Sequence, residues 1–215
     1  MYHFITDKEY LKKLKSCCSD IINQLVQFIN EDGVMEVQAH LVGSGARNLI
    51  TQNEQEPVDL DYNLEILDSG EFNINDGRGI EEYVRKAFNK VLNRNGWGDC
   101  HDSTSAFTTE QRVFNEGNKT PFSIDLCIIR CDQIGWYRLI HKKTGWVDLD
   151  QYYWNQAPNS HGLQNRVDWL KEQSLWIEVR EAYLKKKNWY LRYQNYDHSS
   201  FNCFIEAVNE VYNKY

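Results

Sequence analysis

The sequence lacks any apolar run that approaches the length of a membrane span, and its first residues do not form the apolar stretch of a signal peptide. None of its six cysteines forms a Cys-x-x-Cys pair, and their spacing is poor for a zinc site. Internal repeats and low-complexity tracts are also missing. These absences argue against membrane, secreted and zinc-finger classes, and we expect a cytoplasmic protein with reduced thiols and no membrane partner.

An excess of positive charge is likewise missing. The chain has 24 Lys and Arg against 31 Asp and Glu, a net charge of −7. We therefore do not expect extended nucleic-acid binding, although a local basic patch remains open. The 41% hydrophobic and 26% charged residues are typical of a globular protein, and 215 residues suit one domain, or a domain with an appended subdomain.

The apolar spacing predicts an α/β (α+β) order of helix, strand, helix, strand, helix, several strands and then helices. The strongest linker signal is Pro158 to Gly162. It divides the chain into a core domain, 1–157, and a helical C-terminal region, 158–215. Within the core, the sequence predicts a first helix capped by Thr6, a short helix over 45–52, an acidic strand over 58–67, and a hairpin that joins 136–140 to 146–149.

Two acids alternate with leucine in Val58-Asp59-Leu60-Asp61. Because successive side chains of a strand point to opposite faces, we expect Asp59 and Asp61 on one face, about 6.5–7 Å apart. Two such carboxylates resist burial unless a cation compensates them. Mg²⁺ takes oxygen ligands from carboxylates and substrate phosphates, so the pair predicts a magnesium site. The alternative is a pair of solvated residues on an edge strand.

Asp125 is the single charge in the apolar run from Phe122 to Ile129. A lone carboxylate there is costly unless it faces a site or a partner, and Arg112 is the alternative partner. If this strand pairs with the acidic strand, three carboxylates converge. They could then hold two divalent ions roughly 3.5–4 Å apart, the arrangement used for in-line phosphoryl displacement.

A Gly43-Ser44 turn precedes the acids. Glycine permits close backbone approach, and a following helix start offers unpaired N–H groups to a phosphate. The Ser44 hydroxyl can donate to a phosphate oxygen, and Arg47 can supply charge unless it is only a surface helix residue. Gly43, Ser44 and Arg47 are therefore the predicted nucleotide-binding residues.

These three motifs, in this order and each on a predicted strand, resemble the DNA polymerase β-like nucleotidyltransferase superfamily. Its pattern is a strand that ends in Gly-Ser, Asp-x-Asp on the next strand and a third Asp on a later strand. The resemblance covers about residues 34 to 130. It implies a nucleotidyltransferase-like mixed β-sheet flanked by helices. It also implies transfer of a nucleoside monophosphate from a nucleoside triphosphate, with ATP as the default, to an acceptor.

The same resemblance implies roles for single residues. Asp59 and Asp61 would hold the Mg²⁺ that bridges the triphosphate, and Asp125 would join them at a second ion and help to activate the acceptor hydroxyl. The chain departs from the family pattern after Ser44, where Gly-Ala-Arg-Asn and a longer acidic insert follow. This departure concerns the role of Arg47 and not the aspartates.

The acceptor is unidentified. Compact size and acidic charge favour a small molecule, while a protein, tRNA or second nucleotide stays open. The rival hypotheses are a non-catalytic nucleotide- or partner-binding protein that retains the fold, and an α+β protein with coincidental acids.

Other polar groups receive structural interpretations. The segment from Lys185 to Tyr196 combines cations with aromatics like a nucleic-acid surface, but we interpret it as a helix end whose aromatics pack on the core domain. His40, His101 and His141 lack metal-ligand spacing and are interpreted as ordinary polar or core residues.

Overall fold

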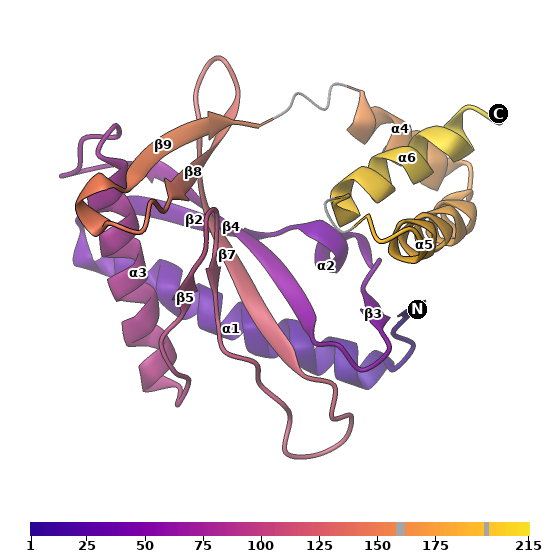
Figure 1. Cartoon of the computed structure of the whole chain (residues 1–215), viewed down its shortest axis with the longest axis horizontal. Helices are drawn as coiled ribbons and strands as arrows, with labels where there is room; N and C mark the ends of the chain where they lie inside the picture. Colours follow the sequence, from indigo (N-terminus) through magenta and orange to yellow (C-terminus); the bar gives the residue numbers. More distant parts are fainter. Residues whose placement is uncertain (158–161, 196–197) are drawn as a thin grey trace.

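The computed structural model describes residues 1–157, 162–195 and 198–215. Residues 158–161 of the predicted linker (158–162), and Tyr196, lie outside the described residues. The fold is a mixed β-sheet flanked by helices, followed by a helical C-terminal region (Figure 1), as the sequence predicted. No helix among the described residues is long and apolar enough to cross a membrane.

Helices and strands are mixed up to residue 94, strands predominate from 101 to 156, and helices follow. The helices are α1 (Lys8–Asp32), α2 (Gly43–Arg47), α3 (Gly77–Arg94), α4 (Leu163–Glu172), α5 (Trp176–Arg192) and α6 (Ser200–Tyr212), with a 3₁₀ turn η1 (Val147–Leu149). The strands are β1 (Tyr2–Phe4), β2 (Glu36–Leu41), β3 (Thr51–Asn53), β4 (Val58–Asp68), β5 (His101–Asp102), β6 (Phe107–Thr108), β7 (Phe122–Cys131), β8 (Trp136–Lys142) and β9 (Gln151–Gln156).

The main sheet has seven strands in the order β2-β4-β7-β6-β5, with β8 beside β7 and β9 beside β8. The two central strands, β4 and β7, run parallel, and every other pair in this sheet is antiparallel. Their register places Asp61 directly beside Asp125. The predicted pairing of the two acid-bearing strands is therefore confirmed.

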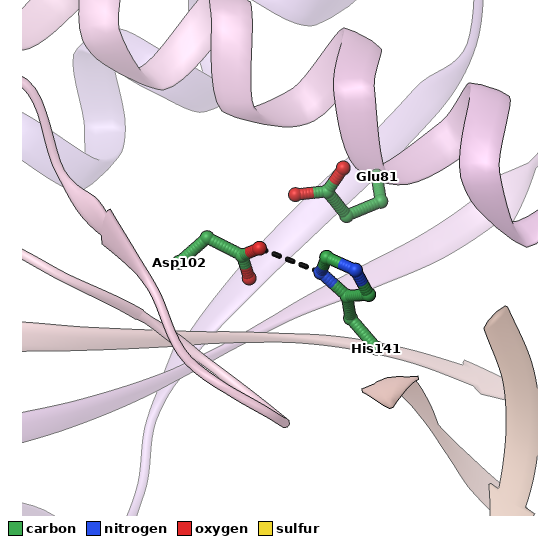
Figure 2. A group of neighbouring side chains, drawn as sticks. All are labelled: Glu81, Asp102 and His141. Carbon is green, nitrogen blue, oxygen red and sulfur yellow. Dashed lines mark hydrogen bonds and ion pairs between the residues drawn. The ribbon is translucent and has the colours of Figure 1, made fainter. Parts of the chain in front are cut away.

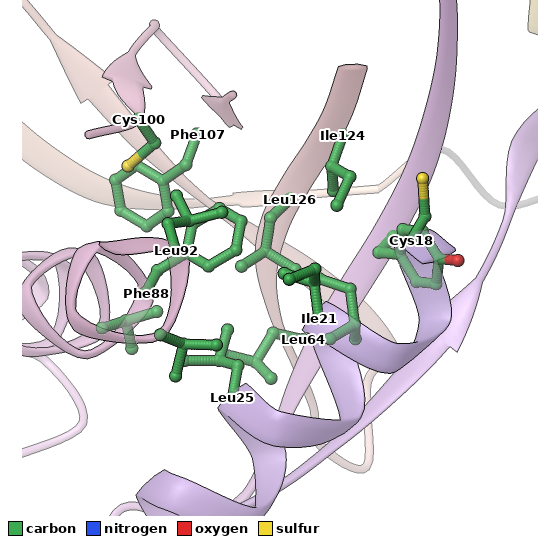
Figure 3. Close-up of a cluster of buried hydrophobic side chains, with 14 of the residues drawn as sticks. Cys18, Ile21, Leu25, Leu64, Phe88, Leu92, Cys100, Phe107, Ile124 and Leu126 are labelled. Atoms are coloured by element: carbon green, nitrogen blue, oxygen red, sulfur yellow. The ribbon is translucent and has the colours of Figure 1, made fainter. Parts of the chain in front are cut away.

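Helices α1 and α3 cover one face of the sheet, and the largest core lies between them and the strands (Figure 3). Strand β4 contributes Leu60 and Leu64 to this core, and β7 contributes Ile124 and Leu126, all fully buried. Burial of each such side chain stabilises the fold by about 1.5–3 kcal/mol. Because strand side chains alternate, the odd-numbered residues of both strands face the other side of the sheet.

The other side of the sheet faces α2 and the C-terminal helices. Helices α4, α5 and α6 lie together next to α2 (Figure 1) and bury their apolar faces against one another. Leu49, which follows α2, is part of this second cluster and links it to the sheet domain. The predicted boundary between residues 157 and 158 stays a prediction, since it meets the residues outside the description.

Several predicted boundaries are wrong. The carboxylate of Asp7, not the Thr6 hydroxyl, caps α1 by accepting the Tyr10 N–H. The helix expected over 45–52 is instead α2 followed by strand β3. The second strand of the hairpin is β9 rather than 146–149. The carboxylate of Asp150 accepts bonds from the backbone N–H and hydroxyl of Thr144, which folds the intervening residues into a loop.

Candidate functional site

Strands β4 and β7 carry the three predicted acids on the face opposite α1 and α3. Asp61 lies beside Asp125 in the parallel register, and Asp59 lies beside Ser123. Leu60 and Ile124, which alternate with the acids, are buried in the core. The alternation thus leaves the carboxylates to face α2 and the C-terminal helices.

Two hydroxyl groups hold the outer acids. Ser123 Oγ donates to Asp59 Oδ1, and Thr108 Oγ1 on β6 donates to Asp125 Oδ1 at 2.6 Å. The alternative partner proposed for Asp125 is not used, because the Arg112 guanidinium lies over the Trp97 ring. The sequence interpretation missed both hydroxyls, although Ser123 stands two residues before Asp125 and therefore shares its face.

The carboxylates carry more negative charge than their surroundings compensate. Burial, followed by the charges of Asp125 and Asp59, raises the pKa of Asp61 to about 6, while Arg138 and Arg47 act in the opposite direction. Burial also raises the pKa of Asp125, against the Thr108 hydrogen bond. A cation would relieve this repulsion, and an all-oxygen donor set is what Mg²⁺ prefers.

Gly43 packs directly against Asp61. Its φ is +61°, and a Cβ at this position would lie 2.2 Å from Asp61 Oδ2. The backbone N–H of Val42 donates to the Asp61 carbonyl at 2.8 Å, which fixes the turn to β4. Only glycine therefore fits between α2 and the acid without moving one of them.

Ser44 and Arg47 follow in α2. Among the described residues, none hydrogen-bonds the Ser44 hydroxyl, so it is available to a ligand. Arg47 donates to the Gly43 carbonyl at 2.9 Å, and its guanidinium lies 4.4 Å from the centre of the Phe204 ring on α6. Burial lowers the pKa of Arg47. Arg47 is thus an interface residue rather than a surface charge, and its contact with a nucleotide stays a prediction.

Lys187 on α5 is a further candidate that the sequence interpretation missed. Its Nζ donates to Thr51 Oγ1 at 2.9 Å and lies 3.9 Å from the centre of the Tyr2 ring. Burial lowers the pKa of Lys187 to about 8, while Cys203, Asp61 and Asp59 act in the opposite direction. It is therefore a partly desolvated cation whose pKa the charges of Asp61 and Asp59 raise.

Of the aromatic residues after Lys187 that the structure describes in this segment, none packs on the main core of the sheet domain as expected. Tyr190 packs against the cluster formed by α4, α5 and α6, and its hydroxyl donates to Glu206 on α6. Trp189 and Tyr193 are 52% and 63% exposed. The predicted packing on the core domain is wrong because these helices bury one another.

A second group of potential metal ligands lies elsewhere in the sheet domain. Among the described residues, the group whose ligand atoms all lie within 4.8 Å of one another is Glu81, Asp102 and His141, not the three aspartates. Its members line the same small cavity as Leu126 and Ile128, which alternate with Asp125 on β7. This group therefore lies on the opposite face of the sheet and is separate from the predicted site.

No protein-family model matches the chain, and comparison of its sequence with characterised proteins gives no match. Several solved structures share its fold. The structure of Escherichia coli MS115-1 CdnC with ATP matches with a TM-score of 0.61 and 13% identity, over 96% of this chain and 61% of CdnC.

Vibrio cholerae DncV, a cyclic AMP-GMP synthase solved with the linear intermediate pppA(3′,5′)pG, matches with a TM-score of 0.52 and 13% identity, over 81% of this chain and 47% of DncV. Its GTP-bound form matches with a TM-score of 0.51. The chain thus spans less than two thirds of the length of either protein. This chain therefore shares the fold of CdnC and DncV, which agrees with the nucleotidyltransferase-like mixed sheet that its three motifs predicted.

Proposed function

We propose that this protein is a metal-dependent nucleotidyltransferase that moves a nucleoside monophosphate from a nucleoside triphosphate to an acceptor hydroxyl. The observation that carries the proposal is the parallel pairing of Asp61 with Asp125, with Gly43 packed against Asp61. The fold shared with CdnC and DncV supports it.

Asp59, Asp61 and Asp125 are the proposed Mg²⁺ ligands. Three neighbouring carboxylates, two of them with raised pKa values, suit divalent cations with oxygen ligands. When bound, Mg²⁺ would neutralise the triphosphate and the charge that develops during transfer. The proposal of two ions follows from the number of carboxylates.

The reaction forms one bond and breaks one. The acceptor oxygen bonds to the α-phosphorus, and the bond from that phosphorus to the bridging oxygen of pyrophosphate breaks. We assign to Asp125 the orientation of the acceptor hydroxyl and the acceptance of its proton. Ser44 can donate its hydroxyl to a phosphate oxygen. Pyrophosphate leaves with the electron pair of the broken bond.

Two cations lie near the acids and suit a triphosphate. The charges of Arg47 and Lys187 are both coupled to Asp61. We assign Lys187 to the triphosphate, because its ammonium is partly desolvated and can shift from Thr51 Oγ1 to a phosphate oxygen.

The proposed acceptor is a second nucleotide. DncV is a cyclic AMP-GMP synthase and was solved with a linear dinucleotide intermediate, and 81% of this chain matches it in fold. A small-molecule acceptor is the second candidate, since the compact size and the net charge of −7 favour it.

The test is turnover with defined nucleotides. The protein is incubated with Mg²⁺ and each nucleoside triphosphate, alone and in pairs, and pyrophosphate release and product mass are measured. We expect Asp61→Asn and Asp125→Asn to lower the rate by about 10²-fold or more. Asp68→Asn is the matched control, because Asp68 ends the same strand β4 and is exposed.

Two outcomes oppose the proposal. One is the absence of pyrophosphate release with every nucleotide pair, together with the absence of Mg²⁺-dependent nucleotide binding. The other is turnover in Asp61→Asn and Asp125→Asn at the rate of Asp68→Asn. Pyrophosphate release without a dinucleotide product would keep the enzyme class and reject the nucleotide acceptor.

A further inference from the structure

The group Glu81, Asp102 and His141 brings three elements together. Glu81 comes from α3, Asp102 from β5 and His141 from β8, and their side chains point toward one another (Figure 2). Ligand atoms of all three lie within 4.8 Å of one another. They line a cavity of about 20 Å³, which is large enough for one water molecule or one ion.

Glu81 is a buried carboxylate with an unsatisfied oxygen. It is 4% exposed, and its Oε1 accepts no hydrogen bond from the described residues. Arg85 Nε lies 3.3 Å away, but it too is without a hydrogen bond, and the Arg85 side chain is 40% exposed. Burial and the charge of Asp102 raise the pKa of Glu81. The cavity therefore holds an acceptor that needs a cation or a donor.

The imidazole of His141 is held as metal-ligating histidines are held. Its Nε2 bonds to Asp150 Oδ2 at 3.1 Å, and Asp150 is fixed in turn by the backbone N–H of Thr144 at 2.7 Å. The Tyr152 ring stacks on the imidazole with ring centres 4.2 Å apart. A histidine that ligates a metal usually donates its other N–H to a carboxylate in this manner. Nδ1 is then left to face Asp102, 2.6 Å away.

We propose that Glu81, Asp102 and His141 bind a divalent transition-metal ion, with Zn²⁺ as the best match, at a site separate from the nucleotide site. One imidazole with two carboxylates suits Zn²⁺ better than Mg²⁺, which prefers oxygen ligands alone. Three protein ligands leave a fourth tetrahedral position, which a water molecule usually fills at a zinc ion.

Binding replaces contacts of the metal-free state. The Nδ1 atom of His141 and the Asp102 carboxylate become ligands of one ion, and the proton between them goes to solvent. Lys143 Nζ, 3.3 Å from Asp102 Oδ2, belongs to a side chain that is 49% exposed and can turn outward. The ion then ties α3 to β5 and β8, so it stabilises the sheet edge.

Zn²⁺ binding to the metal-stripped protein tests the proposal. The Asp61→Asn/Asp125→Asn double variant serves as the parent, which weakens metal binding at the nucleotide site. Calorimetric titration with Zn²⁺ is expected to give one ion per chain, and the melting temperature is expected to rise with Zn²⁺ concentration. Co²⁺ as a second probe should give a visible absorption spectrum with a nitrogen ligand.

Single changes in the parent locate the ion. Glu81→Gln retains the hydrogen bonds of His141 and should weaken Zn²⁺ binding at least about 10-fold, and Asp150→Asn should weaken it by about 10- to 100-fold. Glu82→Gln is the matched control, since Glu82 is next to Glu81 on α3 but its side chain is 41% exposed. If the parent binds no Zn²⁺, or if Glu81→Gln binds it as tightly as Glu82→Gln, the group is only an ion-pair network.

Discussion

Replacing Gly43 with alanine tests whether the turn before α2 positions Asp61. The φ of Gly43 is +61°, a conformation that costs a non-glycine residue about 1–2 kcal/mol. The added Cβ would lie 2.2 Å from Asp61 Oδ2, so the turn or the carboxylate must move. A displacement of about 1 Å near the reacting atoms can lower a rate by about 10²-fold. We expect Gly43→Ala to lose at least about 1–2 kcal/mol of unfolding free energy and about 10²-fold in turnover.

Gly33→Ala is the matched control for this prediction. Gly33 ends α1 with a φ of +72°, and nothing lies within 4 Å of its added Cβ. The variant thus has a similar backbone cost without the contact to Asp61. Urea denaturation measures the stability of both variants, and pyrophosphate release measures their turnover. The reasoning fails if Gly43→Ala retains the turnover of Gly33→Ala, or if both variants lose turnover equally.

Three further predictions concern charge and packing. Without metal, the free energy of unfolding should fall by up to about 3 kcal/mol on account of Asp61 as the pH rises from about 4 to 6, because folded Asp61, with a pKa of about 6, keeps a proton that the unfolded chain releases. Urea titrations of Asp61→Asn should show a smaller fall, since the raised pKa values of Asp125 and Glu81 still contribute. A fall in Asp61→Asn as large as in wild type would contradict the prediction. Lys187→Met should raise the KM for the nucleoside triphosphate about 10-fold, because a charge-assisted hydrogen bond is lost. Lys185→Met is the control and should match wild type in steady-state kinetics. Equal KM values for Lys187→Met and Lys185→Met would show that Lys187 does not contact the triphosphate. Phe88→Ala empties a fully buried core position and should cost about 3–5 kcal/mol in urea denaturation, and a cost below about 1 kcal/mol would mean that the core is not packed as described.

Long periodic elements were predictable from the sequence, and short ones were not. The alternation of Leu60 with Asp61 predicted which face of β4 packs in the core, because the face with the leucines must be buried and the face with the carboxylates cannot be buried. Strands β5 and β6 have two residues each, too few for a periodic signal. Thr6 and Asp7 are both good N-caps, so the sequence alone did not decide which of them begins α1.

The position of the three aspartates on one face of β4 and β7 was predictable, because each interrupts or alternates with an apolar strand. Lys187 was not, since a lysine on a helix is usually solvated, and its partner Thr51 is 136 residues away. Glu81 offered a signal that was overlooked. It stands three residues before Val84 and seven before Phe88, which places a carboxylate on the buried stripe of α3. A charge on such a stripe indicates a partner that only the fold brings near.

The most direct test of the central claim is a crystal structure of the protein with Mg²⁺ and a non-hydrolysable ATP analogue. We predict Mg²⁺ bound by Asp59, Asp61 and Asp125, with the triphosphate of the analogue beside Ser44 and Lys187. An analogue bound elsewhere, or a triphosphate whose Mg²⁺ has none of the three aspartates as a ligand, would contradict the proposed nucleotidyl-transfer site.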